Sequence, residues 1–350
     1  MSLLTEPAPG MPVLGDPTTA RLLDLRPLLT RAVRWLYPVQ LALIGWVVFH
    51  LWHGMPLLAL ISGSFFAIYL KSLWYWRRDS RAAQPIAALV RDATWRHVGV
   101  TVLGGVAHLT TLAVLVDGAT VVLRVPSLYG AHRTQLRRQQ QAWLVGPDAD
   151  GVAALRIDGS HEAHPATTVP APTGRRAIPK AEQVEPTLAW ALHLRRLARR
   201  PLTTLVLAAV FATPVFTGDT DLGLPAILIV SCLFSLTLTW SNFTAWCLWP
   251  AWRLPRLVRR GGWVTAQVAA EPLPAGARSS RGATARLTLP GGTTAVAAMP
   301  YVLFDVVGTF TELGWLSVAG EVKRGRWVAL GYPGYPVLTI AKITSVDGTA

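Results

Sequence analysis

Two long stretches of this chain carry almost no charged residues, and arginine clusters lie on both sides of each stretch. The first, Trp35 to Leu70, contains no Asp, Glu, Lys or Arg. The second, Pro201 to Trp252, is broken only by Asp219 and Asp221. Apolar runs of this length are typical of helices that cross a membrane. The flanking basic residues are Arg21, Arg26, Arg31, Arg34, Lys71, Arg77, Arg78, Arg81, Arg195, Arg196, Arg199, Arg200, Arg253, Arg256, Arg259 and Arg260.

Each stretch is too long for a single crossing. One helix over Trp35–Leu70 would measure about 54 Å, whereas the hydrocarbon core of a bilayer is about 30 Å thick. Gly54-Met55-Pro56 offers a turn within the first stretch, and the polar segment Thr217–Gly223 offers one within the second. The pattern therefore predicts four spanning helices, which are Leu36–His53, Leu57–Tyr75, Leu202–Phe216 and a longer helix between Pro225 and Pro250.

The residues after each stretch alternate between apolar and polar positions, as β-strands do. Each β region has two alternating runs around a dipeptide that suits a tight hairpin turn, Asp117-Gly118 in one and Gly291-Gly292 in the other. The shared order of features predicts that the chain repeats one unit. The matching runs are Leu112–Val116, Thr120–Val125, Trp143–Gly146 and Val152–Ile157 in the first region, and Ala285–Leu289, Thr293–Met299, Trp315–Gly320 and Arg326–Leu330 in the second.

These patterns predict a membrane α+β protein built from two tandem units. Each unit is a transmembrane helical hairpin followed by a small cytoplasmic antiparallel β domain, with four transmembrane helices in total. The predicted parts are a disordered N-terminus (1–17), an amphipathic helix with hairpin 1 (18–78), β domain 1 (79–158), a Pro-rich linker (159–186), an amphipathic helix with hairpin 2 (187–253) and β domain 2 (254–350).

The distribution of basic residues predicts the orientation of the chain. Arginines flank the outer ends of both hairpins, whereas their tight turns contain no Lys or Arg, so the positive-inside rule places both termini and both β domains in the cytoplasm. The predicted location is the bacterial cytoplasmic (inner) membrane, multi-pass, N-in and C-in. Tryptophans near the basic side are predicted to be membrane-interface anchors: Trp35, Trp74, Trp76, Trp246, Trp249 and Trp252.

Composition agrees with this interpretation and weakens one alternative. Hydrophobic residues make up 51% of the chain and charged residues 15%, below the roughly 25% charged residues of ordinary soluble domains. The net charge is +14 and the pI is near 10.8, which also occurs in nucleic-acid-binding proteins. Since no helix-turn-helix, RNA-recognition or zinc-finger pattern is present, nucleic acid is not expected as a partner.

Candidate chemistry is sparse. His50 and His53 lie three residues apart, as do His161 and His164, and either pair could contribute to a metal site. A zinc site needs three or four ligands on a positioned scaffold, and neither pair has further ligands nearby, so no metal or other cofactor is expected. The chain has no nucleophile elbow, Walker A loop or H-E-x-x-H motif. The prediction is a protein that is not an enzyme.

One basic run in the first β region is a candidate for contact with lipid headgroups. It contains Arg133, Arg137 and Arg138, although a solvated face would look the same. The predicted function is a non-enzymatic integral inner-membrane protein whose two β domains bind a protein partner or lipid headgroups. The alternative is a subunit of a small oligomeric channel or transporter. Expected partners are membrane lipids, an unknown protein and a second copy of the chain.

Overall fold

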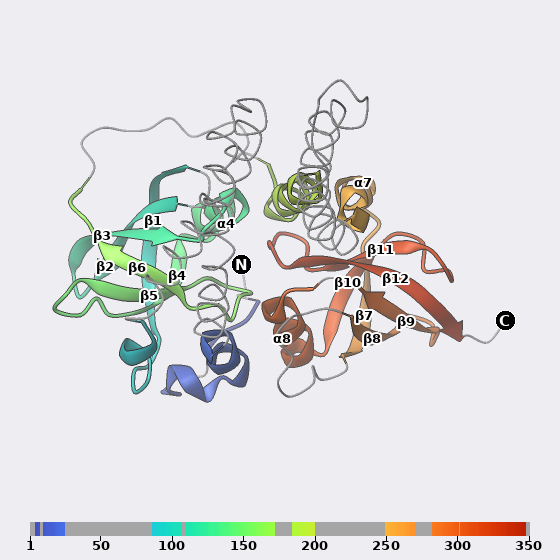
Figure 1. Ribbon diagram of the computed structural model, residues 1–350, viewed down its shortest axis with the longest axis horizontal. Coiled ribbons are helices and arrows are strands. Elements are labelled where there is room, and N and C mark those ends of the chain that lie inside the picture. Colours follow the sequence, from blue (N-terminus) through green and yellow to red (C-terminus); the bar gives the residue numbers. More distant parts are fainter. Residues whose placement is uncertain are drawn as a thin grey trace, which may run out of the picture.

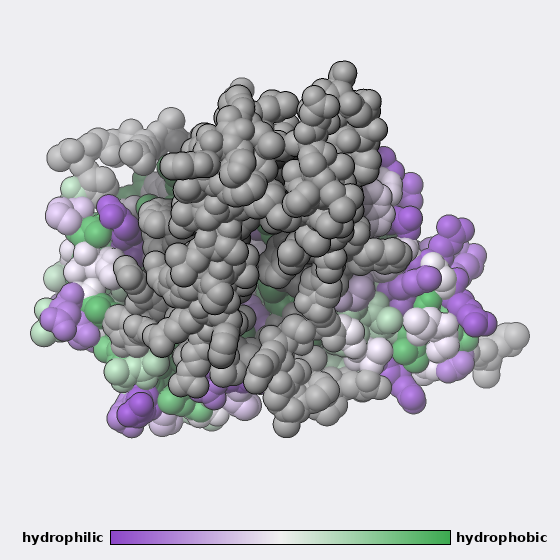
Figure 2. Space-filling model, viewed as in Figure 1, coloured by the Kyte–Doolittle hydropathy of each residue, from purple (hydrophilic) through white to green (hydrophobic). Residues whose placement is uncertain are grey.

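Two closed antiparallel β-barrels make up most of the described structure. The computed structural model describes residues 4–7, 10–24, 86–106, 109–171, 184–199, 249–270, 282–300 and 302–347. In Figure 1 the first barrel lies on the left and the second on the right, with the N-terminal segment (blue) beside the first barrel and the end of the second barrel pointing to the C-terminus. Hydrophilic side chains are prominent along the outer edges of both barrels (Figure 2).

The first barrel has six strands in the order β1-β2-β3-β6-β5-β4, with β4 paired back to β1. Each pair of neighbouring strands is antiparallel. A helix, α4, connects β3 to β4. The elements are β1 (Arg96–Val106), β2 (Leu109–Val116), β3 (Ala119–Pro126), α4 (Gly130–Gln139), β4 (Gln141–Val145), β5 (Val152–Arg156) and β6 (His164–Thr168).

The second barrel has the same connectivity. Three strands, a helix and three more strands close in the order β7-β8-β9-β12-β11-β10, again with antiparallel neighbours. The elements are β7 (Val264–Ala270), β8 (Ala283–Thr288), β9 (Thr294–Met299), α8 (Phe304–Leu313), β10 (Trp315–Ala319), β11 (Trp327–Gly331) and β12 (Leu338–Asp347). The predicted internal repeat is thus supported only weakly, as a shared order of strands within the β regions.

The predicted two-residue hairpin turn is confirmed in the first barrel. Asp117 and Gly118 join β2 to β3 with φ values of 49° and 83°, and two successive positive φ angles match the twist of the flanking strands. The second hairpin has a longer connection, because Gly291 and Gly292 (φ 94° and 83°) belong to a turn in which the Gly292 N–H donates to the Leu289 carbonyl (3.1 Å). The sequence thus indicated both hairpins, but the tight turn predicted at Gly291-Gly292 is wrong.

Alternating strand residues fill each barrel. In β2 the exposure alternates along the strand, and Leu112 and Val114 point into a core shared with Leu123 and Leu155. Each connecting helix contributes to its own barrel core, α4 through Leu136 and α8 through residues that include Phe310. Burial of these apolar side chains is the main stabilising term of both barrels.

Arginine-rich helices pack against the second barrel. A helix at 186–199 lies beside η3 (Trp249–Arg253) and α7 (Leu254–Arg260). The apolar side chains of this helix, including Trp190 and Leu194, share a buried cluster with Leu254 and with Ile340 of β12. The sequence predicted an amphipathic helix here that could lie in a membrane interface. Its apolar face is instead covered by protein.

The structure contradicts the predicted fold class. The described residues form two six-stranded barrels with few helices, rather than helical hairpins carrying small β domains. No helix in the described part of the chain is both long and apolar enough to cross a membrane. The predicted spans Leu36–His53, Leu57–Tyr75 and Leu202–Phe216, and the one between Pro225 and Pro250, lie outside the described residues.

The predictions built on those four spans are corrected with the fold class. They are the integral-membrane function, the channel or transporter alternative, and the multi-pass inner-membrane location with N-in and C-in topology. The physical reason can be seen only at the amphipathic segment 186–199, which was predicted to lie in the membrane interface. Its leucine and tryptophan side chains pack on a β-barrel.

Candidate functional site

The loop between β5 and β6 joins the first barrel to its surroundings. Asp158 in this loop accepts hydrogen bonds at Oδ1 from the backbone N–H groups of Leu4 (2.8 Å) and Thr5 (2.9 Å). From α4, the Gln135 side chain donates to the Asp158 carbonyl (2.7 Å) and the Gln139 side chain donates to Oδ2 (2.7 Å). Hydrogen bonds therefore fix this loop, although most of it lies in the segment 159–186 that was predicted to be an extended, Pro-rich linker.

The same loop binds the second barrel through α8. The His161 backbone N–H donates to the Asp305 carboxylate, and the Thr309 hydroxyl donates to the Gly159 carbonyl (3.1 Å). A Cβ atom at Gly159, where φ is +77°, would lie 3.2 Å from side-chain atoms of both Leu4 and Tyr335. A residue larger than glycine at position 159 would therefore press on both the N-terminal segment and the second barrel.

Asp16 begins a short helix at 17–24 and links it to the first barrel. Its Oδ1 accepts from the Thr18 N–H (2.9 Å) and its Oδ2 from the Thr19 hydroxyl (2.8 Å), as expected of a helix N-cap. The same Oδ2 lies 3.1 Å from Arg156 Nη1 and 2.7 Å from His161 Nδ1. One carboxylate therefore caps a helix and binds two cationic side chains.

His161 lies between carboxylates from two parts of the molecule. Nδ1 contacts Asp16, and Nε2 lies 3.0 Å from Glu312 Oε2 on α8. At this distance the protonated imidazole forms an ion pair with the Glu312 carboxylate. Burial disfavours the charged imidazolium, but Asp16, Glu312 and Asp305 outweigh it and raise the pKa of His161 to about 9.

The neighbouring carboxyl groups have opposite shifts. Burial by itself would raise the pKa of Asp16, yet the hydrogen bond and charge of His161, with Thr19 and Arg156, lower it well below its usual range. Burial raises the pKa of Asp305, and His161 offsets only part of that rise. At neutral pH the cluster therefore contains an ionised Asp16 beside a protonated His161.

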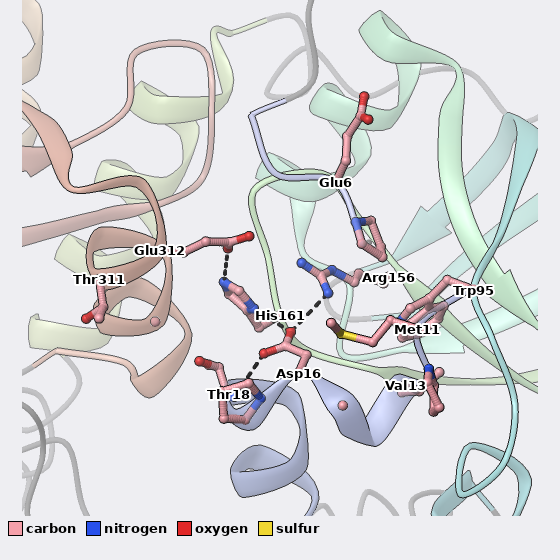
Figure 3. Close-up of a pocket in the computed structure, with 15 residues that line it drawn as sticks. Glu6, Met11, Val13, Asp16, Thr18, Trp95, Arg156, His161, Thr311 and Glu312 are labelled. Carbon is pink, nitrogen blue, oxygen red and sulfur yellow. Dashed lines mark hydrogen bonds and ion pairs between the residues drawn. The ribbon is translucent and has the colours of Figure 1, made fainter. Parts of the chain in front are cut away.

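A cleft with a volume of about 350 Å³ opens beside this cluster. Met11, Pro12, Val13 and Trp95 form an apolar wall from the N-terminal segment and the start of the first barrel. Helix α8 forms the opposite wall through Thr311 and Glu312. Figure 3 shows the charged side chains of Arg156, His161 and Asp16 between these two walls. The remaining lining residues are Glu6, Pro7, Gly15, Pro17, Thr18 and Gly308.

Arg156 is the most unusual side chain of the cleft. It is 2% exposed, and in the described part of the structure its guanidinium makes one hydrogen bond, from Nη1 to Asp16. Its Nε is buried with no acceptor among the described residues, and the same holds for Nε1 of Trp95, which also lines the cleft. A guanidinium has five N–H donors, and leaving a buried donor without an acceptor costs about 1–3 kcal/mol. An acceptor group that reached these buried donors would remove this cost.

The geometry favours binding over proton-transfer chemistry. A general base must have a ring nitrogen available to the proton that it removes. Both ring nitrogens of His161 face carboxylates, and its raised pKa keeps it protonated at neutral pH. The arrangement can hold a ligand next to Arg156, but His161 cannot accept a proton there.

The arginines predicted to contact headgroups have different environments. Arg133 is 5% exposed, and its Nη1 donates to the Thr110 hydroxyl (3.3 Å) and to the Leu128 carbonyl (3.2 Å) inside the first barrel. Arg137 is half-buried and Arg138 is exposed. The buried Arg133 therefore stabilises the first barrel through these hydrogen bonds. A headgroup role for Arg137 and Arg138 stays a prediction.

The predicted tryptophan anchors are only partly described. Trp249 is 52% exposed on η3, and Trp252 is half-buried with two arginines over its ring. Trp35, Trp74, Trp76 and Trp246 lie outside the described residues. The anchor role of these side chains stays a prediction.

The structure separates the two histidines of the His161/His164 pair. His164 Nδ1 lies 3.0 Å from the Ser127 hydroxyl, and its ring is 5.8 Å from that of His132, away from Asp16. Burial, followed by the charge of His164, lowers the pKa of His132 to about 3. No group of three or more ligand side chains in the described residues could hold a metal ion. His50 and His53 lie outside the described residues.

Sequence reasoning missed Asp16, Arg156 and Glu312, whose positions are far apart in the chain. One local signal was available, because Asp16-Pro17-Thr18 has the pattern of a helix start, with an acidic N-cap and Pro at the first helical position. No local sequence pattern predicts a role in the cleft for Arg156 or Glu312. No protein-family model, curated protein or solved structure matches this chain.

Proposed function

We propose that this protein is a non-enzymatic binding protein that holds a small molecule in the cleft between its two barrels. The observation that carries the proposal is Arg156, whose guanidinium is 2% exposed, lies on the wall of a cavity of about 350 Å³ and has one carboxylate partner among the described residues. Ligand pockets combine an apolar lining with a few polar groups that fix orientation. This cleft has that composition.

The chemistry of the two walls defines the ligand class. The Arg156 donors favour a carboxylate or another planar acceptor group, since a guanidinium binds such groups through paired hydrogen bonds. The apolar wall of Met11, Val13 and Trp95 favours a compact hydrophobic body on the same molecule. A small aromatic or aliphatic monoacid meets both requirements.

Charge balance limits the ligand to a single negative charge. The cleft lining places three acidic side chains, Glu6, Asp16 and Glu312, against two cationic ones, Arg156 and His161. A dianion would meet these carboxyl groups in a site without excess positive charge, so phosphate-like ligands are disfavoured. One acid group can share the donors of Arg156 without displacing Asp16.

Binding of the fluorescent sulfonate 1-anilinonaphthalene-8-sulfonate tests this proposal, because it joins an apolar body to a single negative charge. Titration into the full chain should give one saturable site, and benzoate should compete for it. Arg156→Met should weaken binding about tenfold or more, since a hydrogen bond to a charged group contributes roughly 1.5–3 kcal/mol. The matched control is Arg124→Met, at an exposed position of β3.

Two further measurements separate loss of the site from loss of the fold. Thermal melting of each variant reports whether the barrels remain folded. Arg156→Lys keeps the charge but not the planar fork of donors, so it should fold and bind more weakly than the native chain. Equal affinity in the native chain, Arg156→Met and Arg156→Lys would contradict the proposal.

A further inference from the structure

Six arginines form a second feature of the molecule, away from the cleft. Arg195 and Arg196 lie on the helix at 186–199, and the others lie at the end of η3 and on α7. Five of them are exposed and Arg195 is half-buried. We call them the arginine face: Arg195, Arg196, Arg253, Arg256, Arg259 and Arg260.

Packing fixes the direction in which these side chains point. The helix at 186–199 buries Ala191 and Leu194, and α7 buries Leu254 and Val258, in one apolar cluster beneath the two helices. Helix residues three and four positions apart share a face, so the arginines between the buried positions lie on the outer side. Figure 2 shows hydrophilic side chains on the edge of the second barrel, where α7 lies in Figure 1.

The face has a single sign of charge. The helix at 186–199 and α7 contain no Asp or Glu, and none of the ion pairs between described residues involves a member of the arginine face. Partial burial and then the charges of Arg199, Arg259, Arg196 and Arg256 lower the pKa of Arg195. Such mutual repulsion costs stability unless a bound anion relieves it.

Tryptophans accompany the arginines. The guanidiniums of Arg253 and Arg256 lie 5.7 Å and 5.2 Å from the ring centre of Trp252, within the range of cation–π contact. Trp249, one helical turn earlier, is 52% exposed. The exposed Trp249 ring suits a boundary between water and apolar groups, because an indole ring is apolar and its N–H can bond to polar groups.

We infer that the arginine face docks peripherally on an anionic phospholipid surface. A sheet of phosphate and carboxylate headgroups matches a face that carries only positive charge over two helices. A folded protein partner would require an apolar centre to its interface, and Trp249 is the one large exposed apolar side chain on these elements in the described structure. Single-stranded nucleic acid would stack its bases on aromatic rings, and guanidiniums already lie over Trp252.

This docking is electrostatic and does not need a helix to enter the lipid. The apolar faces of both helices remain covered by protein, namely the second barrel and the start of α4 of the first barrel. Basic residues near a lipid surface each strengthen binding by about fivefold, and salt weakens the attraction. The inference is independent of the cleft, since no member of the arginine face lines it.

Co-sedimentation of the full chain with vesicles tests the inference. The protein should bind vesicles of phosphatidylcholine with phosphatidylserine, bind pure phosphatidylcholine much less, and dissociate from the mixed vesicles at high salt. Arg196→Gln/Arg256→Gln/Arg259→Gln should weaken binding to the mixed vesicles by about a hundredfold, at roughly fivefold for each arginine. The control is Arg124→Gln/Arg286→Gln/Arg324→Gln, which removes equal charge from exposed positions elsewhere and should change binding by no more than about twofold.

Three outcomes would overturn the inference. They are equal binding to charged and uncharged vesicles, an equal loss of binding in the control variant, and tighter binding of a DNA oligonucleotide than of the mixed vesicles. Thermal melting of both triple variants confirms that the comparison is between folded proteins. The cleft titration with 1-anilinonaphthalene-8-sulfonate should be unchanged in both, so a failure here leaves the cleft proposal intact.

Discussion

His161 and Glu312 join the two barrels directly, with His161 Nε2 lying 3.0 Å from Glu312 Oε2. His161 belongs to the loop between β5 and β6, and Glu312 belongs to α8 of the second barrel. On its other side His161 contacts Asp16 of the N-terminal segment at 2.7 Å. Three distant parts of the chain thus meet at one protonated imidazole, and their meeting forms one side of the cleft.

Replacing Asp16 should destabilise the protein strongly. Asp16→Asn leaves Arg156 and His161, which are 2% and 3% exposed, without their shared counter-charge. Breaking a buried ion pair by removing one partner costs about 3–5 kcal/mol. Urea unfolding should therefore show a loss of about 3 kcal/mol in the free energy of unfolding.

The exposed ion pair between Arg96 and Asp117 is the control for that measurement. The two side chains are 46% and 82% exposed at a separation of 3.2 Å. Asp117→Asn should cost less than about 1 kcal/mol, because exposed pairs contribute little, and Asn tolerates the positive φ at this turn. Similar losses in the two variants would contradict the account of Asp16.

Stability should fall as the pH rises above neutrality. The pKa of His161 is raised from 6.5 to about 9 in the folded protein. The stabilisation from its ion pairs is therefore fully present below pH 6.5 and is lost as the pH rises through about 9. A shift of this size corresponds to a change on the order of 3 kcal/mol. Thermal melting from pH 6 to pH 10 measures it.

His161→Gln identifies the source of this pH dependence. Glutamine can still donate to Asp16 but does not titrate, so the variant should be less stable at neutral pH and should lose most of the decline above it. Three carboxyl groups face His161, those of Asp16, Glu312 and Asp305. An equal decline in the variant would show that other groups cause it.

Gly308 allows the N-terminal helix to approach α8. A Cβ atom at Gly308 would press on Thr18 Cγ2 and lie 2.8 Å from Thr18 Oγ1. Gly to Ala within a helix normally gains about 1 kcal/mol, but overpacking here should reverse the sign and cost about 1–3 kcal/mol. The Thr18→Ala variant removes the two closest atoms and leaves only the Cβ atom of residue 18, at 3.1 Å from the new methyl group. In that variant, Gly308→Ala should lower the free energy of unfolding by at least about 1 kcal/mol less than in the native chain. An unchanged loss would refute the contact.

Arg133 and Arg138 should respond differently to the same substitution. Arg133→Met removes hydrogen bonds to Thr110 and Leu128 inside the first barrel, and should lower the free energy of unfolding by about 2 kcal/mol. Arg138→Met changes an exposed position and should stay within about 0.5 kcal/mol. Urea unfolding of the two variants decides whether Arg133 is a structural residue, as its burial implies.

Local features of the barrels could be predicted from the sequence, whereas their closure could not. The turns at Asp117-Gly118 and Gly291-Gly292 follow from residues that tolerate positive φ. Pairing of β4 with β1, or of β3 with β6, depends on contacts between distant segments. The helix α8 was missed because Val306, Val307 and Gly308 are weak helix formers, and packing against the barrel core overrides that preference.

The cleft could not be predicted from the sequence either, because it too depends on contacts between distant segments. Asp16 lies in a segment that its proline and glycine content predicted to be disordered, and His161 in a segment predicted to be a linker. Composition predicts flexibility only when a segment has no partners, and here Asp158, Asp16 and His161 supply hydrogen bonds between segments. The arginine clusters of the helix at 186–199 and of α7 are visible in the sequence. That protein covers the apolar sides of these helices is visible only in the structure.

Photolabelling locates the ligand most directly. A benzoate that carries a photoreactive diazirine should label the native chain at the residues that line the cleft, as read by mass spectrometry of the digested protein. These residues are Glu6, Pro7, Trp95, Arg156, His161 and the lining positions within 11–18 and 308–312. Excess benzoate should prevent this labelling, and Arg156→Met should lose most of it. Labelling confined to other parts of the chain, or cleft labelling that is equal in Arg156→Met, would contradict a binding site anchored by Arg156.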